Sequence, residues 1–166
     1  MFGYNTISID QKHRFSIPAK YRADFLKTNE TELVVTKDPQ YPSLKVYKGS
    51  EWEIISSKLQ SLQGLDPIVR NLQWTILGNA SVTDLDPSGR MLVLLPEELR
   101  NYAELDNDNK FSFIGMGNKF EIWNTDNWNL RQTGGTLATE ILDVVLPISI
   151  KAVSYTHLTL PTMVQV

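Results

Sequence analysis

An aspartate followed four positions later by an arginine occurs at two similar places in this sequence, as Asp10 with Arg14 and as Asp86 with Arg90. An aspartate at the end of a strand can accept hydrogen bonds from the backbone amides of the turn that follows it. An arginine that opens the next strand offers paired donors to a phosphate or to a guanine edge in the major groove of DNA. The spacing therefore fits a turn that binds an anion or a base. It equally fits an ion pair that only sets the shape of the turn.

Further cations surround the first of these turns. Lys12 and His13 lie between Asp10 and Arg14, and Lys20 and Arg22 follow shortly after. The whole chain carries a net charge of −3, which by itself does not indicate a nucleic-acid-binding protein. A local basic stripe can still bind phosphate if one face presents it. The alternatives without a binding role are that Lys20 and Arg22 belong to a solvated helix face and that His13 is an ordinary loop histidine.

The residues around each turn predict a strand before it, a strand after it and then a short helix that starts at a proline. Strands are predicted over 5–10, 14–17, 32–36, 43–47, 81–86, 90–95, 111–116 and 119–123. Helices are predicted to begin at Pro18, at an N-cap Ser50, at an N-cap Asp66 with Pro67 following, at Pro96, and at Thr125 or Asp126. A tight turn is expected at Gly117-Asn118 between the last two strands.

The same order of elements thus occurs twice, which predicts an α+β fold with a duplicated unit. The predicted parts are a first repeat over 5–48, a connecting helical pair over 49–79, a second repeat over 80–124, a C-terminal helix and tail over 125–152, and a non-native tail over 153–166. The last part contains VSYTHLTLPT, which resembles the translation of a sequencing adaptor, so no role is expected for His157.

The two copies differ in ways that bear on their roles. His13 stands where the second copy has Gly89, and histidine adopts a positive φ less readily than glycine. Eight positions separate Arg14 from Arg22, but ten separate Arg90 from Arg100. The two extra residues predict a bulge or a longer strand in the second copy. Arg100 is therefore a less secure counterpart of Arg22.

Composition excludes several classes of function. The chain has 166 residues, no cysteine and two histidines without metal-ligand spacing, so neither thiol chemistry nor a metal or other cofactor is expected. No glycine-rich phosphate loop is present, and neither an enzyme nor a small-molecule substrate is expected. No apolar run is long enough to span a membrane and no signal peptide is apparent, and the lack of cysteine fits a reducing cytoplasm. Phe15 and Tyr21 fall at positions typical of core, which argues against base stacking in RNA binding.

Five stretches of the chain together resemble one family. They are DQKHRFSIPAKYR, DPSGRMLVLLPEELR, YKGSEWEIISSKLQSL, ILGNAS and GMGNKFEIW, and they are similar to the MraZ family of bacterial transcriptional regulators over positions 1 to about 132. The family belongs to the AbrB-like, swapped-hairpin class. The resemblance implies two tandem AbrB-like hairpin and helix units that form an intertwined barrel, with the helical pair between them.

The resemblance also implies function. It indicates a sequence-specific regulator, usually a repressor, that binds short direct repeats in double-stranded promoter DNA upstream of its own cell-division and cell-wall operon. Ring-like homo-oligomers and association with the nucleoid are implied as well. An antitoxin-like or other protein-interaction module of the AbrB class is the alternative.

Residue roles follow from the same resemblance. Arg14 and Arg90 are expected to face DNA. The residues expected beside them, as phosphate or base contacts, are Lys12, His13, Lys20 and Arg22. The residues expected to orient the turns are Asp10, Asp86 and Gly89, the last at a position where the family commonly has glycine in both copies.

Overall fold

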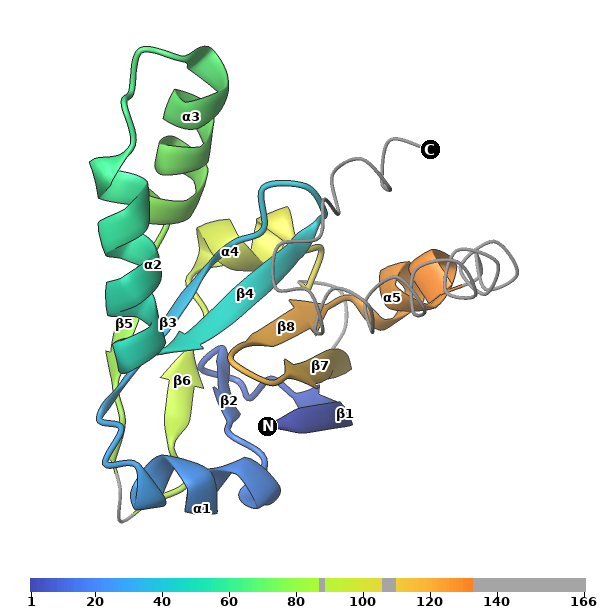
Figure 1. Cartoon of the computed structure of the whole chain (residues 1–166). Coiled ribbons are helices and arrows are strands. Elements are labelled where there is room, and N and C mark those ends of the chain that lie inside the picture. The colour runs from blue at the N-terminus through green and yellow to red at the C-terminus, as the bar shows by residue number, and fades with distance from the viewer. Residues whose placement is uncertain (87–88, 106–109, 133–166) are drawn as a thin grey trace, which may run out of the picture. The chain divides into compact units, whose positions relative to one another are not determined.

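A computed structural model describes residues 1–86, 89–105 and 110–132 (Figure 1). The non-native tail predicted over 153–166 and most of the predicted part 125–152 lie outside these residues. The strands are β1 (Phe2–Ser8), β2 (Arg14–Ser16), β3 (Glu32–Lys37), β4 (Ser43–Lys48), β5 (Ser81–Asp84), β6 (Leu92–Leu94), β7 (Lys110–Met116) and β8 (Phe120–Trp123). The helices are α1 (Ala19–Lys27), α2 (Gly49–Ser61), α3 (Pro67–Leu72), a π-helical turn η1 (Gln73–Leu77), α4 (Glu97–Tyr102) and α5 (Thr125–Gln132).

The strands form two antiparallel sheets. The larger sheet has the order β1-β7-β8-β4-β3-β5, and the smaller one is a ribbon of β2 and β6. These elements confirm the predicted α+β class. The predicted closed barrel is wrong for the described residues, because the six-stranded sheet is open and has β1 and β5 at its two edges. The swapped-hairpin arrangement stays a prediction.

Strands that flank a short loop pair with each other, and the tight turn expected at Gly117-Asn118 is one such loop. β3 pairs with β4, and β7 pairs with β8 across a turn in which Gly117 has a φ of 95°. The strands on either side of each Asp-x-x-x-Arg turn, however, do not pair with each other as predicted. β1 pairs with β7, β2 with β6, and β5 with β3. These partners are distant in sequence, so turn signals carry no information about them.

Helix starts agree in part with the sequence. Asp66 caps α3 as predicted, because its side chain accepts a hydrogen bond from the Ile68 amide at 2.8 Å. Pro18 and Pro96 stand at the N-cap, one residue before the position predicted for them. The predicted cap Ser50 is wrong, since Lys48 is the N-cap of α2 and the Ser50 hydroxyl instead contacts Glu30.

The start of α5 also differs from the prediction. The Asn124 side chain accepts a hydrogen bond from the Asn127 amide at 3.1 Å, and the Asn124 carbonyl accepts one from the Trp128 amide at 2.9 Å. These are the bonds of an N-cap residue. Neither Thr125 nor Asp126 therefore takes the capping position.

An aromatic core anchors the ribbon to the larger sheet. Phe15 of β2 is 1% exposed, and its ring meets that of Phe111 edge-on at 5.7 Å between centroids. Tyr21 of α1 contacts the Phe120 ring at 4.9 Å. Phe15 and Tyr21 are thus core residues, as predicted. Since one face of the ribbon is packed in this way, only its opposite face is available to a partner.

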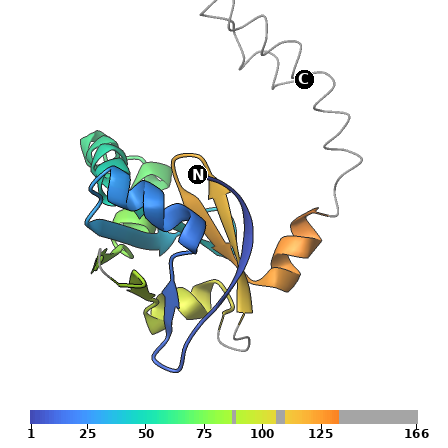
Figure 2. The same ribbon diagram turned by 90° about the horizontal axis from the view of Figure 1, so that it is seen from below.

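The loop between β1 and β2 projects from the body beside α4 (Figure 2). This loop contains the first Asp-x-x-x-Arg unit. Elsewhere, none of the helices within the described ranges has the length and apolar character needed to cross a membrane.

Candidate nucleic-acid interface

The first turn, residues 10–14, is closed by hydrogen bonds to Asp10. The Asp10 carboxylate accepts the amide protons of Lys12 and Arg14, each at 2.9 Å between nitrogen and oxygen. The His13 amide donates to the Asp10 carbonyl at 3.0 Å, and the Asp10 amide donates to the Arg14 carbonyl at 2.8 Å. Asp10 therefore fixes the path of the backbone, as its position in the sequence predicts.

The Arg14 guanidinium is held by the same carboxylate. Its Nε and Nη2 both lie 3.0 Å from Asp10 Oδ2, and the side chains of Arg14 and Asp10 are 37% and 38% exposed. The hydrogen bond from the Arg14 amide is the main cause that keeps the pKa of Asp10 below its ordinary value, and the Arg14 side chain adds to it. A guanidinium has five N–H donors, so this pairing leaves donors for a further acceptor. The ion pair therefore orients Arg14 and leaves some of its N–H donors for a partner.

The second turn begins with the same backbone bond as the first. The Gly89 amide donates to the Asp86 carbonyl at 3.2 Å, as the His13 amide does to Asp10. A Cβ at Gly89 would lie only 3.1 Å from Asp86 Oδ2, so a larger residue would crowd that carboxylate. Arg90 is exposed, and its carbonyl accepts a hydrogen bond from the Ser16 hydroxyl at 2.5 Å. Within the described residues, its guanidinium has no hydrogen bond or ion pair.

The last residues of the two turns correspond in backbone conformation, but not in the alignment that the sequence suggested. His13 and Met91 both adopt a left-handed backbone, with φ of 62° and 52°. The His13 carbonyl accepts from the Leu95 amide at 2.9 Å, and the Met91 carbonyl accepts from the Ile17 amide at 3.2 Å. Met91, not Gly89, therefore occupies the position equivalent to His13 at the end of its turn.

This match shows where the two extra residues of the second copy lie. β2 and β6 are both three residues long, so the predicted bulge or longer strand is wrong. The extra residues lie in the turn instead. Arg14 consequently opens β2, whereas Arg90 lies two positions before β6 begins.

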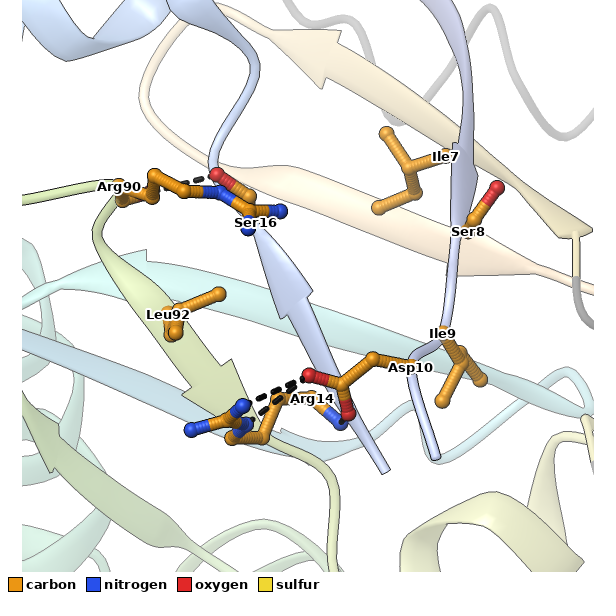
Figure 3. A pocket seen from close by; sticks show the side chains of 8 residues that line it. All are labelled: Ile7, Ser8, Ile9, Asp10, Arg14, Ser16, Arg90 and Leu92. Carbon is orange, nitrogen blue, oxygen red and sulfur yellow. Dashed lines mark hydrogen bonds and ion pairs between the residues drawn. The ribbon is translucent and has the colours of Figure 1, made fainter. Parts of the chain in front are cut away.

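The ribbon nevertheless brings both arginines to one pocket of about 260 Å³. Figure 3 shows Arg14 at one end of the pocket and Arg90 at the other, with Leu92 between them and β1 opposite. The residues that line it are Ile7, Ser8, Ile9, Asp10, Arg14, Ser16, Arg90 and Leu92. The pocket beside the ribbon thus holds two guanidinium groups with one carboxylate.

The remaining predicted cations lie at different places. Lys12 and His13 precede β2, whereas Lys20 and Arg22 lie on α1, which follows it. The Lys20 ammonium lies over the Tyr21 ring at 4.9 Å from its centroid. The two pairs therefore lie on different elements, one before β2 and the other after it.

Arg22 and Arg100 make matching contacts, so the two are structural counterparts despite the difference in spacing. Arg22 Nε donates to the Ile17 carbonyl at 2.8 Å, and Arg100 Nε donates to the Leu95 carbonyl at 3.0 Å. Arg100 Nη1 also lies 2.9 Å from His13 Nδ1. The sequence reasoning missed Arg100 as a site residue. Its signal was the spacing from the preceding proline, since each arginine lies four positions after Pro18 or Pro96.

Comparison with known proteins gives consistent matches. A family model described as "MraZ protein, putative antitoxin-like" matches residues 1–72 and 76–132. The protein named "Transcriptional regulator MraZ" of Azotobacter vinelandii is 38% identical over 153 residues, which is 87% of this chain and 98% of that protein. The one of Hydrogenovibrio crunogenus, with the same name, is 42% identical over 127 residues, 76% of this chain and 81% of that protein.

Proposed function

The chain belongs to the MraZ family, and we propose that it is a DNA-binding transcriptional regulator without enzymatic activity. We further propose that it represses its own cell-division and cell-wall operon by binding short direct repeats in the promoter. This activity would place it on the nucleoid, in the cytoplasm. The relatives named as transcriptional regulators support the general role.

The observation that carries the proposal is the pair of arginines that line one pocket beside the ribbon. Arg14 pairs with Leu94 in the ribbon, and Arg90 lies four residues before Leu94. At about 3.3 Å per residue, the two arginine backbones are separated by at most roughly 13 Å along the ribbon. The major groove of B-DNA is about 12 Å wide and admits a two-stranded ribbon. Two guanidinium groups at this spacing suit base edges within the groove, or one base edge and one bordering phosphate.

The other residues take supporting roles in this proposal. Arg14 and Arg90 make the principal contacts, and Asp10 orients Arg14. The residues proposed as neighbouring phosphate or base contacts are Lys12, His13, Lys20 and Arg22. Asp86 and Gly89 are proposed to shape the second turn, whose backbone bond matches that of the first.

Self-association into a ring-like homo-oligomer is part of the same proposal. Within the part of the chain that the structure describes, the six-stranded sheet ends in two unpaired edges, β1 and β5. Phe2 on β1 is 76% exposed and Val82 on β5 is 57% exposed. Open edges with apolar side chains favour pairing with another chain. The Asp-x-x-x-Arg turns, called reading turns below, would be repeated around such a ring. That repetition would suit an operator made of direct repeats.

A protein-binding, antitoxin-like role is the second candidate. Apolar side chains are exposed around the junction of α2 and α3 and on η1. Leu65 is 91% exposed, Ile68 73% and Trp74 63%. Such exposure favours a protein contact over a DNA contact. This surface is made by the helical pair, so it does not compete with the ribbon.

A salt titration of binding to the promoter upstream of its own gene, against scrambled DNA of equal length, tests the proposal. We expect tight binding to the promoter that weakens steeply with salt, because each neutralised phosphate contributes a slope of about −0.9. Arg14→Ala should weaken promoter binding by about 1–3 kcal/mol per protomer while the protein stays folded. Equal, weak binding of wild-type protein to both DNAs would reject sequence-specific regulation and favour the protein-binding role.

A further inference from the structure

Arg100 reaches the first turn from the other predicted repeat. It lies on α4, which follows β6, whereas His13 lies in the loop before β2. The contact joins Arg100 Nη1 to His13 Nδ1 at 2.9 Å across 87 positions of sequence. The Arg100 Nε bond to the Leu95 carbonyl at 3.0 Å fixes the other edge of the guanidinium. His13 is therefore held from outside its own turn.

The chemistry of the two groups determines where the imidazole proton lies. A guanidinium nitrogen only donates, so His13 Nδ1 must accept in this contact. A neutral imidazole has one donor and one acceptor, which leaves the proton on Nε2. His13 is exposed, and its Nε2–H is then a donor in the same turn as Arg14. The only acceptors such a group can recognise are a phosphate oxygen, a base edge or a similar oxygen or nitrogen atom.

We propose that Arg100 is a positioning residue for the DNA-reading turn of the opposite repeat, and that it holds His13 as the Nε2–H tautomer facing DNA. This inference rests on the proposed DNA-binding function for its biological meaning, but not for its chemistry. The first reading turn is on this view assembled from both halves of the chain. The first turn then offers an imidazole donor and a guanidinium, whereas the second has Met91 at the position of His13.

The matching contact of Arg22 supplies a control variant. Arg22 makes the same Nε bond, to the Ile17 carbonyl at 2.8 Å, but its counterpart of His13 is Met91, which has no ring nitrogen. Arg22→Met and Arg100→Met thus remove equivalent backbone contacts. Only Arg100→Met removes the partner of His13.

The first experiment measures the tautomer of His13 by ¹⁵N NMR of the imidazole nitrogens in the free protein at alkaline pH, where imidazoles are neutral. A His13→Gly variant assigns the signals, since the chain has only two histidines. We expect one dominant tautomer, with the proton on Nε2, in wild-type protein and in Arg22→Met. Arg100→Met should shift His13 toward a mixture of tautomers. The proposal is overturned if wild-type His13 already shows that mixture, a result that does not require any variant to fold.

The second experiment measures promoter binding in a cycle of Arg100→Met and His13→Gly. Glycine tolerates the φ of 62° at position 13, so this replacement removes the ring and keeps the turn. We expect Arg100→Met to weaken binding by about five- to tenfold with His13 present, and by much less with glycine there. Equal weakening in both backgrounds would show that Arg100 contacts DNA directly or acts on the fold, and would reject a positioning role.

The two experiments separate failure of this inference from failure of the proposed function. If wild-type protein does not distinguish the promoter from scrambled DNA, the proposed function fails and the DNA-reading role of Arg100 fails with it. The NMR result then still decides whether Arg100 sets the tautomer. If the promoter is recognised but the cycle shows no coupling, only the positioning role is rejected.

Discussion

Replacement of each signature arginine by alanine should have unequal effects on promoter binding, even though both arginines line one pocket. Arg14 is already ordered by two contacts with Asp10 Oδ2, each 3.0 Å long. Arg90 has no such restraint on its guanidinium within the described residues. Immobilising a flexible side chain on binding costs about 0.5–1.5 kcal/mol, and Arg14 has largely lost that freedom in the free protein.

The expected magnitudes follow from this difference. A paired contact from arginine to a base contributes about 1–3 kcal/mol, so Arg14→Ala should raise the Kd roughly 5- to 150-fold. Arg90→Ala should have an effect smaller by about 0.5–1.5 kcal/mol, a factor of roughly 2 to 12. Fluorescence anisotropy with labelled promoter DNA at a single fixed salt concentration gives both values.

A control variant and the relative size of the two effects decide whether Asp10 orients Arg14 for DNA. Lys58→Ala on α2 removes the same charge at an exposed position outside the pocket and should leave promoter affinity nearly unchanged. Urea unfolding midpoints of all variants should agree with wild type, which excludes loss of the fold. If Arg90→Ala weakens binding more than Arg14→Ala, Asp10 withdraws Arg14 from DNA and does not orient it.

Three further predictions concern the stability of the scaffold. Burial raises the pKa of Tyr47 from 10.0 to about 12, so an unfolded Tyr47 ionises first as pH rises above 10; urea unfolding should show Tyr47 lowering the free energy of unfolding by about 2 kcal/mol between pH 10 and pH 12, and Tyr47→Phe should remove that part of the loss. Thr36→Val should destabilise by about 1–3 kcal/mol in the same assay, because buried Thr36 donates to the Ile76 carbonyl at 2.6 Å; an unchanged midpoint would mean that the carbonyl finds another donor. A hydrogen bond from Lys48 lowers the pKa of Asp24 below 3.8, so its contribution is present above that pH and lost as pH falls further; acid titration of Asp24→Asn should therefore show a shallower loss of stability than wild type.

Local sequence signals predicted much of this fold. The strands β3 and β4, the Asp66 cap and the Gly117 turn all depend on residues within a few positions of one another, and each was found as expected. The partners of β1 and β2 were not found in this way. They are β7 and β6, which lie far along the chain and are selected by packing of the aromatic core.

The candidate site was predicted in composition but not in geometry. The bonds from Asp10 to its own turn follow from residue type and spacing, and they are present. The Arg100 contact with His13 is different, because it depends on how two segments 87 positions apart meet. Only the matching distance of Arg22 and Arg100 from a proline hinted at it, and the longer interval after Arg90 obscured that match.

The two extra residues of the second turn have a consequence for recognition. They place Met91, with its φ of 52°, where the first turn has His13, and they place Arg90 before the ribbon while Arg14 lies within it. A symmetric pair of turns would present the same donors twice and would favour a palindromic site. This ribbon presents unlike donors at its two ends, so one chain has a direction on DNA. Chains repeated in one orientation would then match direct repeats, and inversion of a single repeat in the operator should reduce the affinity of the assembled protein without changing the number of sites.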